Sequence, residues 1–366
     1  MENENKTIAV AMAAIDKTYV QSIPEPTEYT YGRSYVYWGA NNQYPEYIEG
    51  LFNDCNTLRT IIVGTADYVQ GDDVEFVNTK FTREVNKKGM QARELVKLLA
   101  LDYLKLGGFA FQVIRDTNGD IKELYWLDFR YVRTSKDGNV IYYSEDFGKR
   151  YARQNKVIEF PAFIPEGNKV ESSVVYFKNE KSHIYPSPIY VGAIKACEIE
   201  RNIDEFHLSA LLNGFAPSYW IGFNNGIPSD EDKAELERDL ASKFAGASNA
   251  GAFMMSFANG KDNATEITKL DVTDFGEKYK AAAERARQQI FTAFRAQPCL
   301  FGLVADQAKG FSKVEYTEAF ELYNKTVVRS IQRLICDEID KVMGQKESLK
   351  ITPFTLEDNK QEETVD

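Results

Sequence analysis

The sequence predicts an α+β protein, and three observations lead to that prediction. Apolar residues recur at helical spacing in several long segments, most clearly at residues 92–106 and 312–343. Between those segments lie short runs with strand-like composition, separated by the hairpin dipeptides Asn118-Gly119 and Asp137-Gly138. A small Gly- and Asn-rich insert separates two further long helical segments. Helices segregated from antiparallel strands are typical of the α+β class.

The N-terminal part begins with a segment that shows little periodicity. Pro24 and Pro26 lie within it, and we expect residues 1–44 to form an extended arm. A helix is predicted from about residue 45 to 69, ending at Gly71-Asp72-Asp73, and a second over 92–106, ending at Gly107-Gly108.

After Gly108 the spacing of apolar residues changes from the helical pattern to the alternation typical of strands. Six short strands are predicted, and we expect them to form an antiparallel meander: residues 109–115, 121–127, 131–134, 140–143, 157–160 and 174–177.

Three long helices follow, and each has sequence signals at its ends. Ser187 is a good N-cap with Pro188 at the first helical position, and this helix ends at Asn213-Gly214. The second helix, 274–297, begins with a capping-box-like Asp274 and Glu277 and is stopped by Pro298. The third begins at Ser312, with Glu315 completing a capping box, and carries a continuous apolar stripe to residue 343.

The insert between the first two long helices has its own βαββ pattern. Strands are predicted at residues 219–223, 252–257 and 265–272, and Ser229 caps a highly charged helix over 230–244. The last residues, 344–366, are predicted to form an acidic, disordered tail.

Composition limits the possible functions. With 366 residues, 43% of them hydrophobic, the chain is long enough to bury substantial cores. The net charge of −11 argues against a protein that reads nucleic acid through a basic face. It remains compatible with a protein that surrounds DNA without gripping it, because acidic walls repel phosphates. No segment has the pattern of a signal peptide or membrane span, so we expect a cytoplasmic protein without membrane contact.

The sequence contains few features typical of catalytic or metal-binding sites. The four cysteines show no metal or redox spacing and are interpreted as reduced core or interface thiols. No nucleophile elbow, P-loop, zinc-protease or dinucleotide-binding motif is present, and we expect neither catalytic residues nor cofactors. His207 is interpreted as structural. Asp72-Asp73 and Asp230-Glu231-Asp232 are interpreted as a turn and an acidic first helical turn in preference to metal ligands.

Charged residues on the first two long helices favour contacts between subunits. An exposed ion pair between two subunits contributes only about 0–1 kcal/mol to their association. Packing must therefore drive assembly, while charge sets how the subunits align with one another. The residues are Lys195, Glu198, Glu200, Arg201, Asp204 and Glu205 on the first helix and Glu284, Arg285 and Arg287 on the second.

Several segments resemble the portal proteins of tailed bacteriophages of the HK97 type. The run SPIYVGAIKACEIERNIDEFHLSALLNGFAPSYWIGF resembles the entry to that family's stem, in which a Ser-Pro helix ends at an Asn-Gly-x-x-Pro turn before a strand. ASNAGAFMMSF resembles a turn into a strand, and FTAFRAQPCLFGL a helix-to-loop junction. Upstream, LALDYLKLGGFAFQVIRDTNGDIKELYWLDFRYVR resembles the family's helix, glycine step and hairpin, so the resemblance extends over roughly residues 45–343.

The resemblance implies a non-enzymatic ring, usually of twelve subunits, at one capsid vertex. Double-stranded DNA would be packaged and ejected through it without sequence specificity. The implied partners are the terminase large subunit, the major capsid protein and a head-tail connector, and the implied location is the virion, with host cytoplasm during assembly. The implied parts are an arm (1–44), a wing (45–186), stem helices (187–216 and 273–297) around a clip (217–272), a tunnel loop (298–311), a long helix returning to the wing (312–343) and the tail (344–366).

Two sets of contact residues follow from the resemblance. The tunnel loop would present Asp306, Gln307, Lys309 and Gly310 to DNA, although an ordinary surface loop is also compatible with this composition. The clip would meet the motor and connector through Asp230, Glu231, Asp232, Lys233 and Glu235.

Two other hypotheses remain open. An enzyme or ligand-binding protein could have its pocket in the Tyr-rich N-terminal half, although the cluster between Tyr29 and Tyr47 favours a core or subunit-interface role over sugar or base binding. An adaptor bound through the acidic helix 230–244 is compatible with the portal hypothesis.

Overall fold

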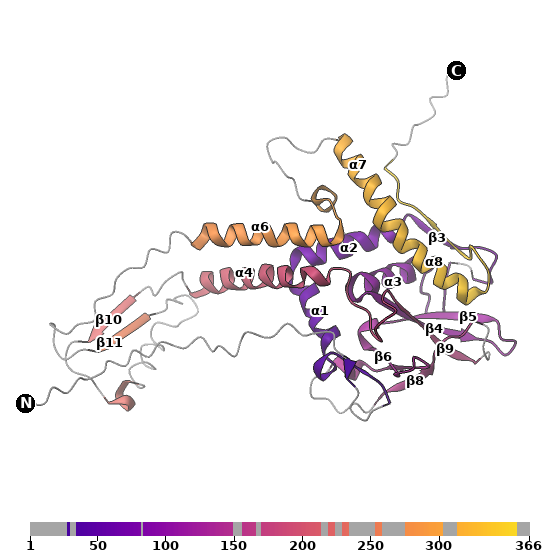
Figure 1. Cartoon of the computed structure of the whole chain (residues 1–366), viewed down its shortest axis with the longest axis horizontal. Helices are drawn as coiled ribbons and strands as arrows, with labels where there is room; N and C mark the ends of the chain where they lie inside the picture. The colour runs from indigo at the N-terminus through magenta and orange to yellow at the C-terminus, as the bar shows by residue number, and fades with distance from the viewer. Residues whose placement is uncertain are drawn as a thin grey trace, which may run out of the picture. The chain divides into compact units, whose positions relative to one another are not determined.

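The computed structural model describes residues 28–29, 34–81, 83–148, 156–165, 170–213, 219–223, 229–233, 253–257, 275–302 and 313–356. Helices and strands are both abundant, so the predicted α+β class is confirmed (Figure 1). The chain divides into two compact units. Unit 1 contains Met1–Gly50, Val69–Pro188 and Ile331–Phe354, and unit 2 contains Leu51–Tyr68, Ile189–Ser330 and Thr355–Asp366.

Unit 1 contains two three-stranded antiparallel sheets in place of the single meander that the sequence predicted. In the first, β4 (Gly108–Arg115) lies between β5 (Ile121–Leu127) and β9 (Ser172–Lys178). The second has the order β6 (Val132–Thr134), β7 (Val140–Tyr143) and β8 (Ile158–Pro161). The chain changes sheet at η3 (Phe129–Tyr131), where the Asp128 carboxylate accepts a hydrogen bond from the Arg130 backbone N–H.

Helix α3 (Ala92–Leu106) has the predicted bounds. Its apolar face is fully buried at Leu95, Val96 and Leu99. Gly107 ends it in the left-handed conformation, with φ +83°, and its N–H donates to the Tyr103 carbonyl. A Cβ at this position would lie 2.2 Å from the Ser187 carbonyl oxygen, so only glycine fits here.

The predicted arm and tail both need correction. From Tyr35 onward the arm belongs to the core of unit 1, and the ring of fully buried Trp38 stacks on Tyr185 at 4.6 Å. This burial confirms the core interpretation for the described part of the aromatic cluster. Within the tail, β12 (Leu349–Thr352) pairs antiparallel with β3 (Asp73–Phe76). The sequence analysis had assigned Asp73, the first residue of β3, to a turn. Residues 1–27 and 357–366 lie outside the described part of the chain.

The first predicted helix is interrupted. Two helices, α1 (Tyr44–Asp54) and α2 (Asn56–Gln70), replace the single helix over 45–69 and meet at Cys55. The interruption has a non-local cause: a buried carboxylate from α4, described below, binds the start of α2.

Unit 2 contains the long helices. Helix α4 (Ile194–Asn213) begins after a short turn, η5 (Val191–Ala193), and therefore later than the predicted start at Ser187. Ser187 does not cap it, because α4 begins only at Ile194. The Ser187 carbonyl accepts a hydrogen bond from the Asn179 side chain, 3.0 Å away, within unit 1. Helix α6 (Phe275–Phe294) ends three residues earlier than predicted, since Arg295 adopts φ +53°.

The third long helix is confirmed over its described residues. It runs through α7 (Lys313–Tyr323), a π-helical turn η9 (Asn324–Val328) and α8 (Arg329–Met343), so the predicted end at residue 343 is correct. The predicted caps at Asp274 and Ser312, and the C-cap at Gly214, lie outside the described residues. Among the helices that the structure describes, none combines the length and apolarity needed to cross a bilayer.

The insert is described at three places. Strand β10 (Tyr219–Phe223) pairs in parallel with β11 (Phe253–Phe257), and residues 230–233 are helical. These segments agree with the predicted strands and helix start. The third predicted strand, 265–272, and residues 234–244 of the predicted helix lie outside the described part.

Replacing Gly107 tests the junction after α3. We expect Gly107→Ala to lower the free energy of unfolding by about 3 kcal/mol, because both the positive φ and the contact with the Ser187 carbonyl are unfavourable for a side chain. Gly89→Ala is the matched control: Gly89 has φ +79° but open space around it, so only about 1 kcal/mol should be lost. Urea unfolding measures both. Equal losses of unfolding free energy in the two variants would contradict the close approach of Gly107 to the Ser187 carbonyl.

Candidate functional site

The candidate functional site is the antiparallel pair of helices α4 and α6 in unit 2 (Figure 1). The start of α4 meets the end of α6, where the rings of Tyr190 and Phe294 stack at 5.2 Å. The far ends meet where Phe206 lies 5.0 Å from Tyr279. Between these points Ile290 is fully buried, so apolar packing contributes to the contact between the two helices.

A buried carboxylate connects α4 to the α1–α2 junction. Glu200 is only 3% exposed. Its Oε1 accepts hydrogen bonds from the Thr57 hydroxyl at 2.7 Å and the Thr57 backbone N–H at 3.4 Å, and its Oε2 accepts from the Cys55 thiol at 3.3 Å. Because Thr57 is in the first turn of α2, Glu200 satisfies a helix N-terminus that would otherwise be buried without a partner.

This placement corrects part of the sequence analysis. Glu200 had been grouped with the charges expected to contact another subunit, but it is an internal ligand of its own chain. Glu198 likewise pairs internally, with Arg201 at 2.7 Å, and Arg201 also approaches Asp54 at 3.9 Å. Helical spacing could have shown that Glu200 follows Cys197 by three residues and precedes Ile203 by three, and both of those neighbours are buried.

The cysteines are free thiols in this structure, as the sequence analysis expected. Cys55 and Cys197 are both buried, and a hydrogen bond to Cys197 together with burial raises the pKa of the Cys55 thiol. The thiols therefore belong to the packing that surrounds Glu200.

Aromatic contacts anchor both flanks of the predicted tunnel loop. After α6, the turn η8 (Pro298–Phe301) receives a hydrogen bond from the Tyr68 hydroxyl to the Leu300 carbonyl at 3.3 Å. The ring of Phe301 lies edge-on to Tyr323 at 5.8 Å, and the Tyr323 hydroxyl is 2.7 Å from that of Thr65. Burial raises the pKa of Tyr323 to about 12. The predicted channel residues Asp306, Gln307, Lys309 and Gly310 lie outside the described part.

The start of the predicted acidic helix is well defined. The Ser229 hydroxyl accepts a hydrogen bond from the Asp232 backbone N–H at 3.2 Å, which confirms Ser229 as the cap. Lys233 pairs with Asp230 at 2.8 Å, one turn away. Asp230, Glu231 and Asp232 are exposed. Glu235, the remaining predicted clip residue, lies outside the described segment.

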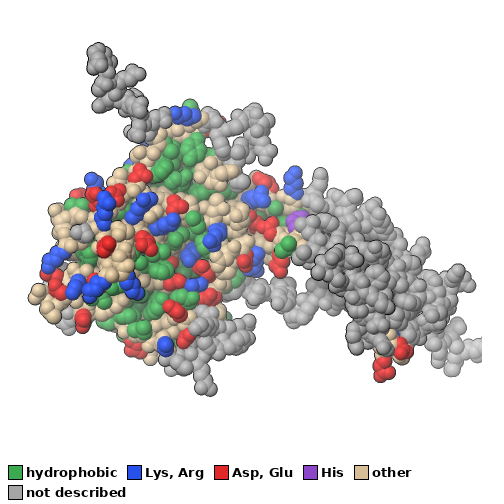
Figure 2. Space-filling view, turned by 180° about the vertical axis from the view of Figure 1, so that it is seen from behind, with side chains coloured by type: hydrophobic (Ala, Val, Ile, Leu, Met, Phe, Trp, Pro, Cys, Tyr) green, Lys and Arg blue, Asp and Glu red, His purple; other side chains and the backbone are tan. Residues whose placement is uncertain are grey.

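The surface has mixed charge. On the face shown in Figure 2, acidic and basic side chains are interspersed, without a broad patch of one sign among the coloured residues.

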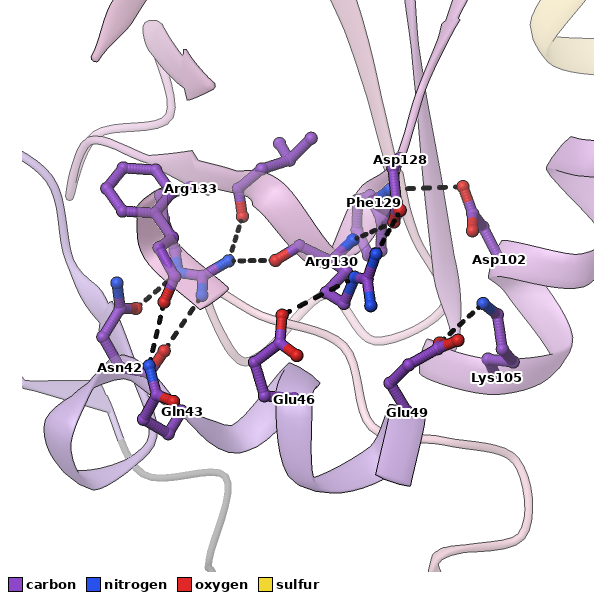
Figure 3. Close-up of polar contacts among 12 residues, drawn as sticks. Asn42, Gln43, Glu46, Glu49, Asp102, Lys105, Asp128, Phe129, Arg130 and Arg133 are labelled. Carbon is purple, nitrogen blue, oxygen red and sulfur yellow. Dashed lines mark hydrogen bonds and ion pairs between the residues drawn. The ribbon is translucent and has the colours of Figure 1, made fainter. Parts of the chain in front are cut away.

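The Tyr-rich half, where the alternative hypothesis placed a ligand pocket, contains a buried polar network (Figure 3). Arg133 is fully buried, and burial lowers its pKa to about 10. Its guanidinium donates to the Asn42 side chain and carbonyl, and to the carbonyls of Arg130 and Val132 at 2.8 and 2.7 Å. Aromatic rings flank the cation, with the Phe147 centroid 5.1 Å away.

A second buried group in this network is Asp102 on α3. Burial raises its pKa to about 8, and its carboxylate accepts from the Trp126 indole at 2.8 Å and the Phe129 N–H at 3.3 Å. Nearby, Lys105 pairs with Glu49 at 2.8 Å. These contacts join α1, α3 and η3 (Figure 3), so the shifted pKa values have a structural cause. Within the described residues, no group of three or more His, Cys, Asp or Glu side chains is placed to hold a metal ion.

The described elements thus define an α+β protein built around a long antiparallel helix pair. Residues 68–357 match the sequence model of the family described as "Phage portal protein". The chain therefore belongs to the phage portal protein family, which is structural and non-enzymatic. The resemblance to portal proteins indicated by the sequence motifs is confirmed.

Solved structures add evidence on the fold. A chain of the structure described as "Virion of native gene transfer agent (GTA) particle" is 19% identical, with a TM-score of 0.52 over 84% of this chain and 83% of that chain. A chain of "Neck of native GTA particle computed with C12 symmetry" is 18% identical, with a TM-score of 0.53 and the same coverage. An HK97-family portal protein from Corynebacterium diphtheriae is 12% identical, with a TM-score of 0.43 over 76% and 89% of the two chains. The search of curated proteins gives no match.

Removing the Glu200 carboxylate tests the centre of the site. We expect Glu200→Ala to lower the free energy of unfolding by about 2–3 kcal/mol, because the donors of Thr57 and Cys55 would be left buried without an acceptor. Glu200→Gln, which keeps an acceptor oxygen, should lose less. Exposed Glu284 on α6 provides the control, with a change of less than about 0.5 kcal/mol in Glu284→Ala. Equal effects of Glu200→Ala and Glu284→Ala would show that the buried contacts contribute nothing.

The shifted pKa of Asp102 predicts a pH dependence of stability. An aspartate in an unfolded chain has a pKa of about 3.9, whereas that of folded Asp102 is about 8. Between these values the unfolded state releases a proton that the folded state keeps, so this group makes the free energy of unfolding fall as pH rises from about 4 to about 8. Asp102→Asn cannot titrate and should show a smaller fall in urea unfolding over that range. Exposed Asp72→Asn is the control, and identical slopes for wild type and Asp102→Asn would contradict the assignment.

Proposed function

We propose that this protein forms a ring at one vertex of a capsid, through which double-stranded DNA is packaged and later released. Family membership over residues 68–357 is the observation that carries the proposal. Support comes from the fold likeness to a particle neck determined with C12 symmetry and to a chain in a virion. The net charge of −11 suits a wall along which DNA moves without being held.

The parts of the chain receive roles in this proposal. Helices α4 and α6 form the stem, and the insert that contains β10 and β11 forms the clip. Exposed Asp230, Glu231 and Asp232, together with Lys233 and Glu235, contact the terminase large subunit and the head-tail connector. Asp306, Gln307, Lys309 and Gly310 form a tunnel loop that faces DNA, and the major capsid protein surrounds the ring. The ring acts in the virion after assembly in host cytoplasm.

Oligomeric state tests the proposal directly. We expect a ring of about twelve subunits, with a mass near 500 kDa given a chain of 41.6 kDa and the C12 symmetry of the similar neck. Mass photometry over a range of salt and protein concentrations measures the mass, and negative-stain imaging shows a central channel. The same measurements after coexpression with the capsid protein control for rings that close only beside their partner. A closed dimer in both preparations would contradict the proposal.

A further inference from the structure

Two cysteines that are far apart in the sequence lie together in unit 2. Cys55 is at the break between α1 and α2, and Cys197 is in the first turn of α4. Both side chains are fully buried, and the two thiols are in hydrogen-bond contact. The other two cysteines, Cys299 and Cys336, are only half-buried. We call Cys55 and Cys197 the thiol pair.

The carboxylate of Glu200 lies beside the thiol pair. Its Oε2 accepts a hydrogen bond from the Cys55 thiol at 3.3 Å, and Glu200 follows Cys197 by one turn of α4. Its Oε1 accepts a hydrogen bond from the Thr57 hydroxyl at 2.7 Å. These contacts fix the negative charge of Glu200 next to the Cys55 sulfur.

Opposing influences act on the Cys55 thiol. Cys55 immediately precedes α2, and its sulfur accepts a hydrogen bond from the Leu58 backbone N–H, so the start of this helix favours the reactive thiolate. The hydrogen bond with Cys197, burial and the charge of Glu200 act in the other direction, and the net result is a raised pKa of the Cys55 thiol. Cys55 therefore stays protonated, and Glu200 is the neighbouring negative charge that disfavours its thiolate.

We propose that Cys55 and Cys197 are a reversible disulfide site that a small peroxide closes, and that Glu200 slows this reaction. Burial selects the oxidant, because hydrogen peroxide is close to water in size, whereas oxidised glutathione is too large to reach a fully buried sulfur. Contact between the thiols selects the product, because the second sulfur is already beside the first when the first is oxidised.

The reaction has two steps. The Cys55 sulfur attacks one oxygen of hydrogen peroxide: an S–O bond forms, the O–O bond breaks, and the leaving hydroxide takes up the thiol proton as water. The Cys197 sulfur then attacks the Cys55 sulfur: an S–S bond forms, the S–O bond breaks, and the second hydroxide leaves with the Cys197 proton as water. Both sulfurs are oxidised, and one peroxide is reduced to two water molecules.

The disulfide joins the α1–α2 junction to the first turn of α4. It closes a loop of about 140 residues, and a cross-link over a long loop restricts the unfolded chain strongly. Host cytoplasm keeps thiols reduced during assembly, and release into an oxidising medium permits the bond. This timing rests on the proposed function, whereas the bond itself depends only on the single chain.

Oxidation of the full-length wild-type chain tests the site. The reduced protein is incubated with hydrogen peroxide, free thiols are blocked under denaturing conditions, and unreduced peptides are mapped by mass spectrometry. We expect a peptide pair linked through Cys55 and Cys197, a midpoint of thermal unfolding about 5 °C higher, and reversal of both by dithiothreitol. The variants C55S and C197S should show neither change, whereas C299S and C336S should show both.

A second experiment tests the role of Glu200. Glu200→Gln removes the charge next to the Cys55 sulfur, so the disulfide should form about tenfold faster than in the wild type. Thr57→Ala is the matched control, because it removes a hydrogen bond of the same carboxylate and leaves the charge in place. Its rate of disulfide formation should equal that of the wild type.

Three results would overturn the inference. The first is oxidation confined to Cys299 and Cys336, or sulfinic acid at Cys55 without a link to Cys197. The second is reaction of the thiol pair with oxidised glutathione as fast as with peroxide, which would show that burial does not select the oxidant. The third is equal acceleration in Glu200→Gln and Thr57→Ala, which would show that loosened packing sets the rate. The oligomeric mass tests the proposed ring separately, and none of these results changes it.

Discussion

The hydrogen bonds that Glu200 accepts determine how unit 2 is arranged. A carboxylate that is 3% exposed is unfavourable unless its oxygens are satisfied, and here Thr57 and Cys55 supply the donors. The same contacts fix the course of the chain. They satisfy the first turn of α2, so the helical segment breaks at Cys55 and restarts, and they hold the first half of α4 against that break.

Once α4 is held in this way, α6 can pack antiparallel to it. The contacts at the two ends, Tyr190 with Phe294 and Phe206 with Tyr279, are aromatic, and Ile290 is buried between them. Apolar packing therefore occupies the inner faces of the pair. Some charged side chains, such as Asp204, Glu205 and Arg285, remain exposed on the two helices, whereas Glu198, Glu200 and Arg201 are bound within the chain.

Sequence signals located the elements whose boundaries are set locally. Gly107 and the turns at Asn118-Gly119 and Asp137-Gly138 fixed the bounds of α3, β5 and β7, which the structure reproduces. The predictions were wrong where residues far apart in the sequence determine the local structure. The pairing of β3 with β12 joins segments more than 270 residues apart, and the break at Cys55 depends on Glu200, 145 residues later. For the candidate site, signals at the helix ends predicted the two helices. They did not show which charged side chains bind within the chain: Glu198 and Glu200 do so, whereas Asp204 and Glu205 are exposed.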